Sequence, residues 1–210
     1  MNRLTDPKFA NIIKSLPIKD HTVVVPTGKI LYLYDSNQKS ELPISREDIF
    51  EERDPIKKLK KTLLWGYPTG IYKFVPALLG DDAELKDLGE KLSKWDTTKD
   101  QQAEVVCAEK LISLATGQNK FRNLGTVTLT KMAYFFRVDV EGNKALILDK
   151  RIIQAAEKWQ ELCKIGLSGG SFDSQQYAEY LKKMSEAART IGCDADQIEF
   201  FLFTFGDSFG

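Results

Sequence analysis

One lysine and one aspartate of this chain have the residue types and the spacing for chemistry on a sugar. Lys131 lies at the start of a predicted helix, and Asp149 lies eighteen positions later, just before the next predicted helix. An amine and a carboxylate on neighbouring helices can converge on one pocket when the connection folds back. A carboxylate stabilises an oxocarbenium-like sugar, and a lysine whose pKa is lowered by burial and by its helix start can attack the anomeric carbon. The pair therefore predicts cleavage of an N-glycosidic bond, with strand cleavage through a Schiff base as a second step.

The sequence around this pair resembles the core of the helix-hairpin-helix DNA glycosylases. In that superfamily a Thr-Lys pair ends the hairpin, an apolar helix follows, and an aspartate at the next helix start completes the site. Residues 130–131, 132–138 and 146–149 occupy these places in order. More narrowly, the stretches TKMAYFF, ALILD and QIEFFLF resemble the short bacterial 8-oxoguanine DNA glycosylase-like proteins. The resemblance extends over residues 55–205 and implies a two-lobed helical fold.

Without the resemblance, each member of the pair also has a structural interpretation. Aspartate is among the preferred N-cap residues, so Asp149 alone fits a helix cap. Lysine is mostly exposed in folded proteins, so Lys131 alone fits a surface residue. The two residues together, in the order that the resemblance requires, favour the catalytic interpretation.

The hairpin of the superfamily reads hydrophobic-Gly-hydrophobic-Gly, which lets backbone amides approach a DNA phosphate. Among the six residues before Lys131, the chain retains Gly125 alone. Threonine hydroxyls and free amides at a helix N-terminus can also hold a phosphate. We therefore expect DNA contacts from Gly125, Thr128 and Thr130.

An enzyme that reaches a base inside a duplex must flip it out, hold it by stacking and fill the vacated space. By its place after an early helix, WGYPTGIY (65–72) resembles the strand-invading loop of the family, with Trp65, Tyr67 and Tyr72 as wedge or platform. The alternative is that Trp65 and Tyr72 anchor a tight turn in the core. Near the C-terminus, helical spacing places most phenylalanines of QIEFFLFTF in the core, while the resemblance implies that Glu199 and Phe203 line the base pocket.

The formal charge is balanced, with 30 basic and 30 acidic residues. Nucleic-acid binders often have a basic excess, so DNA binding here requires a local basic surface. We expect phosphate contacts from Lys120, Arg122, Lys150 and Arg151. The run 57–61 is also lysine-rich, although such a run is most often a solvated helix face.

Composition limits the remaining possibilities. The 210 residues are 42% hydrophobic, enough to bury a core, and no apolar run approaches the ~20 residues that span a bilayer. Cys107, Cys163 and Cys193 are widely separated, which indicates neither a disulfide framework, a zinc site nor an iron–sulfur cluster. The single histidine, His21, is interpreted as structural or exposed, which excludes Ser-His-Asp and Cys-His catalysis. We expect a cytoplasmic monomer without membrane contact, metal or cofactor.

The patterns predict a mostly α fold with a small N-terminal β-hairpin at 22–35. Helix signals follow at 54–64, 82–95, 99–115, 128–137, 150–163, 174–192 and 194–205. We expect residues 1–54 to form an N-terminal segment with the hairpin. Residues 55–210 are expected to form a helical domain of two lobes with a cleft near 116–131.

These observations predict a DNA glycosylase, with AP-lyase capability, that acts on double-stranded DNA containing a modified base. The substrate is either an oxidised purine, as the resemblance implies, or a hypermodified phage cytosine, such as a glucosylated one. Two alternatives remain open. One is a catalytically silent DNA-binding module on the same scaffold, and the other is a helical protein-interaction module.

Overall fold

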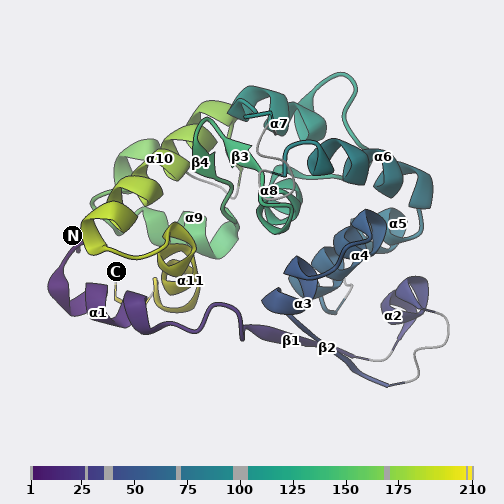
Figure 1. The fold of residues 1–210 in the computed structure, drawn as a ribbon, viewed down its shortest axis with the longest axis horizontal. Coiled ribbons are helices and arrows are strands. Elements are labelled where there is room, and N and C mark those ends of the chain that lie inside the picture. The colour runs from purple at the N-terminus through teal and green to yellow at the C-terminus, as the bar shows by residue number, and fades with distance from the viewer. Residues whose placement is uncertain are drawn as a thin grey trace.

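The computed structural model describes residues 2–26, 28–35, 40–69, 72–96, 104–167, 171–206 and 208–209. This part of the chain is mostly helical with a small two-stranded antiparallel sheet near the N-terminus (Figure 1). The predicted fold class is therefore confirmed. None of the described helices is long and apolar enough to cross a membrane.

The helices and strands follow one another in a single chain order. The helices are α1 (Pro7–Ser15), α2 (Lys29–Tyr34), α3 (Arg46–Phe50), α4 (Pro55–Gly66), α5 (Phe74–Leu79), α6 (Asp82–Ser93), α7 (Ala108–Thr116), α8 (Thr126–Phe135), α9 (Lys150–Ala156), α10 (Ser174–Ile191) and α11 (Ala195–Phe205). The strands are β1 (Thr22–Val25), β2 (Leu42–Ser45), β3 (Asp139–Val140) and β4 (Asn143–Lys144), and a 3-10 turn lies at Cys163–Ile165.

Several helix ends follow directly from local sequence signals. Asp54 caps α4 by accepting hydrogen bonds from the amides of Ile56 and Lys57, and Pro55 occupies the first helical position. Asp173 opens α10 with a capping box, and Gly192 ends it in a left-handed conformation with φ of 75°. These boundaries agree with the sequence-based expectation.

The predicted hairpin at 22–35 is wrong in its second half. Residues 29–34 form helix α2, and β1 pairs instead with β2, in the register Val23 to Ile44 and Val25 to Leu42. Val25 and Ile44 lie on the buried face of this pair, while Val24, next to Val25 on β1, is exposed. The partner of β1 is therefore the strand that follows α2, and not the segment 29–34.

Two predicted helices are shorter than their patterns indicated. Helix α7 begins only at Ala108, because the preceding segment is extended and Val106 pairs with Val140. Residues 99–103 of the predicted helix at 99–115 lie outside the described residues. Helix α9 ends at Ala156, since the following turn buries Trp159 and pairs the chain with Asn2.

Helix α8 lies at the centre of the fold. It packs against α4 and α7, and every side chain from Thr128 to Phe135 is buried. On the other side of the molecule, α11 packs against α1, α9 and α10 (Figure 1). A polar side chain on α8 is therefore enclosed unless a pocket reaches it.

A buried ion pair connects the N-terminal part of the chain to α11. The two terminal guanidinium nitrogens of Arg46 each lie 3.1 Å from a carboxylate oxygen of Glu199, and Nη1 also donates to the hydroxyl of Tyr134 at 3.1 Å. The guanidinium also contacts the rings of Trp65 and Phe200, with its carbon 5.3 and 5.2 Å from their centroids. Burial lowers the pKa of Arg46, but the groups beside it more than offset this effect and raise the pKa above its usual value.

The buried state of Trp65 gives a stability prediction. Its side chain is 5% exposed, lies on the last turn of α4 and contacts Phe135 at a ring distance of 5.4 Å. Trp65→Ala should lower the free energy of unfolding by about 3 to 5 kcal/mol in chemical denaturation. The control is Tyr72→Ala, because Tyr72 is 53% exposed and its truncation should cost less than about 1 kcal/mol. Equal stability of the two variants would contradict the core position of Trp65.

Candidate active site

One pocket brings together most of the residues that the sequence singled out. Its volume is about 540 Å³, and Lys131 and Asp149 both line it although they lie on different elements. Segments from the N-terminal region, the end of α4, α8, the start of α9 and α11 contribute to its walls. The lining residues are His21, Val23, Trp65, Gly66, Tyr67, Pro68, Tyr72, Phe74, Val127, Lys131, Asp149, Lys150, Arg151 and Phe203.

Lys131 reaches the pocket from the middle of α8. The expectation that Lys131 lies at a helix start is wrong, because α8 begins five residues earlier, at Thr126. The side chain passes Gly66 so closely that a Cβ at that glycine would lie 3.2 Å from Cδ and 3.5 Å from Nζ of Lys131. The ammonium lies 4.9 Å from the centre of the Tyr67 ring. Gly66 therefore makes room for the lysine, and Tyr67 covers it.

Asp149 uses its two carboxylate oxygens differently. Oδ1 accepts hydrogen bonds from the amides of Arg151 and Ile152 at 3.0 and 3.2 Å, which caps α9. Oδ2 lies 3.8 Å from Nζ of Lys131. Asp149 is therefore both the N-cap of α9 and the partner of Lys131. The cap also fixes the orientation in which the second oxygen faces the amine.

Both groups are nearly enclosed, with Lys131 7% and Asp149 8% exposed. Burial lowers the pKa of Lys131, and the carboxylates of Asp149 and Glu199 offset this only in part. A lower pKa increases the fraction of neutral amine at physiological pH, and only the neutral amine is a nucleophile. Burial, one of the two causes that the sequence suggested, is therefore the largest cause of the lowering. The other suggested cause, a helix start at Lys131, is absent because α8 begins at Thr126.

The segment before Asp149 is held from the α8 side by Thr130. The Thr130 hydroxyl donates to the carbonyl of Val127 at 2.9 Å and accepts from the amide of Leu148 at 3.2 Å. Thr130 is 0% exposed, so the expected direct contact with DNA is wrong at this position. Its hydroxyl instead ties the helix that carries Lys131 to the segment that carries Asp149.

Two tyrosines of α10 hold the same segment from the other side. The Tyr177 hydroxyl donates to the carbonyl of Leu146 at 2.9 Å, and the Tyr180 hydroxyl donates to the carbonyl of Ile147 at 3.1 Å. Both tyrosines are buried, and burial raises the pKa of each hydroxyl, which therefore remains a donor. The position of Asp149 is thus set by hydrogen bonds from two helices.

The hairpin lies between α7 and α8, at residues 117–125, and not directly before Lys131. Phe121 and Leu124 are its buried anchors, and Asn123 has a left-handed backbone with φ of 58°, which asparagine tolerates better than most residues. Gly125 is the N-cap of α8, and a Cβ there would meet nothing within 4 Å. The backbone at this helix start is therefore open to a close approach.

A second cavity of about 490 Å³ adjoins this helix start. It is lined by Lys120, Asn123, Gly125 and Thr126, and it shares Tyr67 with the pocket that holds Lys131. Free amides at a helix N-terminus favour an anion. Thr128, a predicted phosphate contact, also lines this cavity, although its side chain is buried and its hydroxyl lies 2.9 Å from that of Tyr67.

The four cations predicted to contact phosphates are all exposed. Lys150 and Arg151 line the pocket that holds Lys131, and Lys120 lines the adjoining cavity. Arg122 follows in the same hairpin. They therefore lie on the parts of the chain that surround both cavities.

The lysine run at 57–61 differs from a purely solvated face. Lys58 is buried and donates to a backbone carbonyl, Lys60 pairs with Asp82 at 2.7 Å, and Lys61 pairs with Glu52 at 2.8 Å. These contacts are internal to the protein.

The aromatic residues of the pocket divide into buried and accessible members. Trp65 is part of the core, as the alternative interpretation held, and the wedge interpretation is wrong for this side chain. Tyr72 is exposed, and its ring lies 5.5 Å from Tyr67 and 5.9 Å from Phe74. Phe203 lines the pocket as expected, with the Arg151 guanidinium 5.0 Å from its ring centre.

Two residues differ from their expected roles. Glu199 does not line the pocket, because it is fully buried in the pair with Arg46, so its assignment to the base pocket is wrong. His21 does line the pocket, although no spacing in the sequence connects it to Lys131 or Asp149. Among the described residues, no group of three or more His, Cys, Asp and Glu side chains could hold a metal ion.

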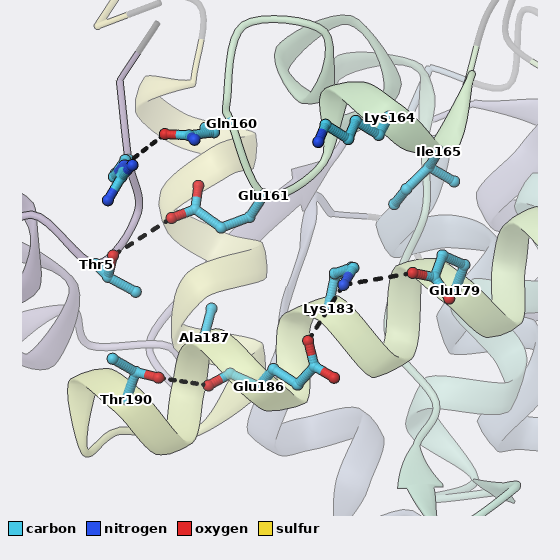
Figure 2. Close-up of a pocket in the computed structure, with 11 residues that line it drawn as sticks. Thr5, Gln160, Glu161, Lys164, Ile165, Glu179, Lys183, Glu186, Ala187 and Thr190 are labelled. Atoms are coloured by element: carbon cyan, nitrogen blue, oxygen red, sulfur yellow. Dashed lines mark hydrogen bonds and ion pairs between the residues drawn. The ribbon is translucent and has the colours of Figure 1, made fainter.

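Another pocket of about 540 Å³ lies between the N-terminal segment and α10, and it contains none of the predicted site residues (Figure 2). Its charged groups are largely paired with one another. Lys183 lies 3.5 Å from Glu179 and 3.3 Å from Glu186, and Glu161 accepts from Thr5. The two pockets have the same volume, so their size does not distinguish them. The residues that line the pocket around Lys131 identify it as the candidate site.

The hydrogen bonds of Thr130 give a test of how the site is positioned. Thr130→Val leaves the buried amide of Leu148 without its acceptor, which should lower the free energy of unfolding by about 1 to 3 kcal/mol. The rate of base release, the activity that the sequence predicts, should fall by about 10-fold to 100-fold, because the segment before Asp149 loses its hydrogen bond to α8 and positions the carboxylate less precisely opposite Lys131. Thr190→Val on α10 is the control, since that exposed hydroxyl contacts only its own helix. If Thr130→Val releases the base as fast as Thr190→Val does, Thr130 does not position the site.

Comparison with known proteins agrees with this geometry. A family model described as "Putative 8-oxoguanine DNA glycosylase OGG-like protein" matches residues 16–203, which is most of the chain. Searches of curated proteins and of solved structures give no match. The matched range includes every residue assigned above to the candidate site. The chain therefore belongs to the OGG-like family of DNA glycosylases.

Proposed function

We propose that this protein excises a modified base from double-stranded DNA and then cleaves the strand at the resulting site. The observation that carries the proposal is the 3.8 Å separation of Lys131 Nζ and Asp149 Oδ2 on the wall of a pocket of about 540 Å³. Pockets of ~300 to 1,000 Å³ are usual for small ligands, and an extruded base is such a ligand. Aromatic side chains in the pocket wall provide surfaces on which a base can stack.

In this mechanism the neutral amine of Lys131 attacks C1′ of the extruded nucleotide. The N–C1′ bond forms while the glycosidic bond breaks, and the base leaves with the bonding electron pair and takes up a proton. Asp149 stabilises the positive charge that develops on the sugar. Transfer of a proton from the lysine nitrogen to the ring oxygen O4′ breaks the C1′–O4′ bond and gives a protonated Schiff base. Loss of a proton from C2′ then forms a C2′=C3′ double bond and expels the 3′ phosphate with its bonding electron pair, which cleaves the strand.

The arrangement also supports a division of work between the two residues. Asp149 is fixed by the α9 cap and by the hydrogen bonds to the preceding segment, so its carboxylate is preorganised for a developing cation. Lys131 is held in the protein interior, where burial lowers its pKa. The pair thus combines electrostatic stabilisation with a usable nucleophile.

We further propose that the base is either an oxidised purine or a hypermodified cytosine such as a glucosylated one. The description of the family favours the oxidised purine. The second substrate would give the protein a role in defence against phages whose genomes carry that base. Incubation with DNA that contains each base, followed by identification of the released base, distinguishes the two.

The catalytic assignment is tested by substitution and by chemical trapping. Lys131→Gln and Asp149→Asn should each slow base release by at least about 100-fold, because they remove the nucleophile and the cation-stabilising group. Borohydride should link wild-type protein covalently to DNA, and Lys131→Gln should not be linked. Lys86→Gln is the matched control, because this lysine is exposed on α6 and lines neither of the two cavities.

Three results would change this assignment. Activity within a few-fold of wild type in both site variants would exclude the pair as the catalytic groups. Base release without strand cleavage by Lys131→Gln would limit the lysine to the lyase step and leave Asp149 to activate water. DNA binding without any base release by wild type would favour the catalytically silent module.

Binding to DNA should depend on the exposed cations around the two cavities. Each phosphate contact contributes about −0.9 to the slope of log affinity against log salt for duplex DNA. The double variant Arg122→Glu and Arg151→Glu should therefore flatten this slope by about 1.8 and weaken binding to all sequences alike. Lys164→Glu is the control, because this exposed lysine lines the pocket beside α10. Salt-independent binding would favour the protein-interaction module instead.

A further inference from the structure

His21 is the only histidine of the chain, and it lies directly before β1 on the wall of the pocket that holds Lys131 and Asp149. The proposed mechanism does not use it. Its position nevertheless places an imidazole on the pocket wall together with the amine of Lys131 and the carboxylate of Asp149. The surroundings of its ring show what this group can do.

The imidazole is held among aromatic rings. Its centroid lies 5.2 Å from that of Trp65, 5.0 Å from that of Phe200 and 5.7 Å from that of Phe203. The backbone is fixed as well, because the carbonyl of His21 accepts hydrogen bonds from Trp65 Nε1 at 3.3 Å and from the amide of Arg46 at 3.2 Å. The ring therefore has a defined place on the pocket wall.

The ring nitrogens, in contrast, have no hydrogen-bond partner among the described residues. Nδ1 is buried without one, whereas Nε2 is not enclosed in this way. A buried polar atom without a partner costs about 1 to 3 kcal/mol, which a phenylalanine of similar size would avoid. A purely structural ring at this position gains nothing from its nitrogens, so their presence points to a ligand.

The charge state of the ring limits what that ligand is. Burial and, as the smaller cause, the positive charge of Arg46 together lower the pKa of His21 to about 4. The ring is therefore neutral at physiological pH and offers no charge to a phosphate. A neutral imidazole carries one N–H donor, and buried N–H groups are orphaned less often than acceptors. The proton consequently belongs on Nε2, at the accessible edge.

We propose that His21 is a specificity-determining residue, whose Nε2–H donates a hydrogen bond to a carbonyl oxygen of the base that occupies this pocket. The inference rests on the proposed function and specifies the ligand further. It requires a base with a carbonyl acceptor on the edge that faces β1. A site built to hydrogen-bond one group discriminates strongly against analogues without it, because its own polar atom is then left unpaired.

Two variants of His21 test this inference. His21→Phe keeps an aromatic ring among its neighbours and removes both nitrogens, and His21→Gln keeps a side-chain N–H donor. Base release is measured on duplexes that carry 8-oxoguanine or glucosylated hydroxymethylcytosine, whichever the wild type processes. His21→Phe should reduce kcat/KM for base release by about 10-fold to 100-fold, and His21→Gln should recover part of that loss.

Binding to a duplex with a tetrahydrofuran abasic analogue distinguishes a contact with the base from a structural role, because a structural role would affect base release and abasic binding alike. This duplex has no base in the pocket, so His21→Phe should bind it as tightly as wild type does and should melt at the same temperature or higher. Equal losses of base release and abasic binding would overturn the inference, as would wild-type base release by His21→Phe. Failure of the wild type to release either base would overturn the proposed function as well.

The single histidine also allows a direct observation. In the Lys131→Gln variant, the ring nitrogen resonances of His21 should shift when a duplex containing the processed base is added. The abasic duplex should leave them nearly unchanged. Unchanged resonances with the base-containing duplex would overturn the proposed contact even if His21→Phe were impaired.

Discussion

The burial of one lysine amine beside one carboxylate is the constraint around which this fold is arranged. Lys131 lies on a helix whose neighbouring side chains are all buried, and a charged group in such a place is unfavourable unless it is paired. Asp149 Oδ2 supplies the partner, and Gly66 and Tyr67 supply the space and the cover. The nearby carboxylates offset the effect of burial only in part, so the pKa of Lys131 is lowered. The same burial therefore destabilises the charged lysine and makes its neutral, nucleophilic form more accessible.

Rigid support surrounds this pair on all sides. Thr130 links α8 to the segment before Asp149, and two tyrosine hydroxyls of α10 hold the same segment. The pair of Arg46 and Glu199 joins the start of α3 to α11, close to the aromatic wall. Hydrogen bonds made by buried groups fix geometry more strictly than apolar contacts do, because a lost partner leaves a polar atom unsatisfied. Such support is what preorganised electrostatic catalysis requires.

The balance of total charge does not prevent a DNA-binding surface. Exposed cations gather at the hairpin and at the start of α9, next to the two cavities, whereas Lys58, Lys60 and Lys61 of α4 are engaged in internal contacts. The open helix start at Gly125 adds uncharged donors to the same region. Local distribution therefore matters more for phosphate binding than the sum over the chain.

The sequence by itself determined the helical class and the starts of α4, α6, α9, α10 and α11, because caps, prolines and apolar periodicity act within one or two turns of chain. It indicated the pairing of Lys131 with Asp149 through its resemblance to the helix-hairpin-helix glycosylases. It did not determine the partner of β1, the place of the hairpin glycine or the role of Thr130. These depend on contacts between segments far apart in the sequence. The presence of His21 in the pocket wall and the absence of Glu199 from it also depend on contacts between distant segments. Both residues owe their places to Arg46, which binds one through its backbone amide and the other through its guanidinium, and no local pattern encodes that meeting.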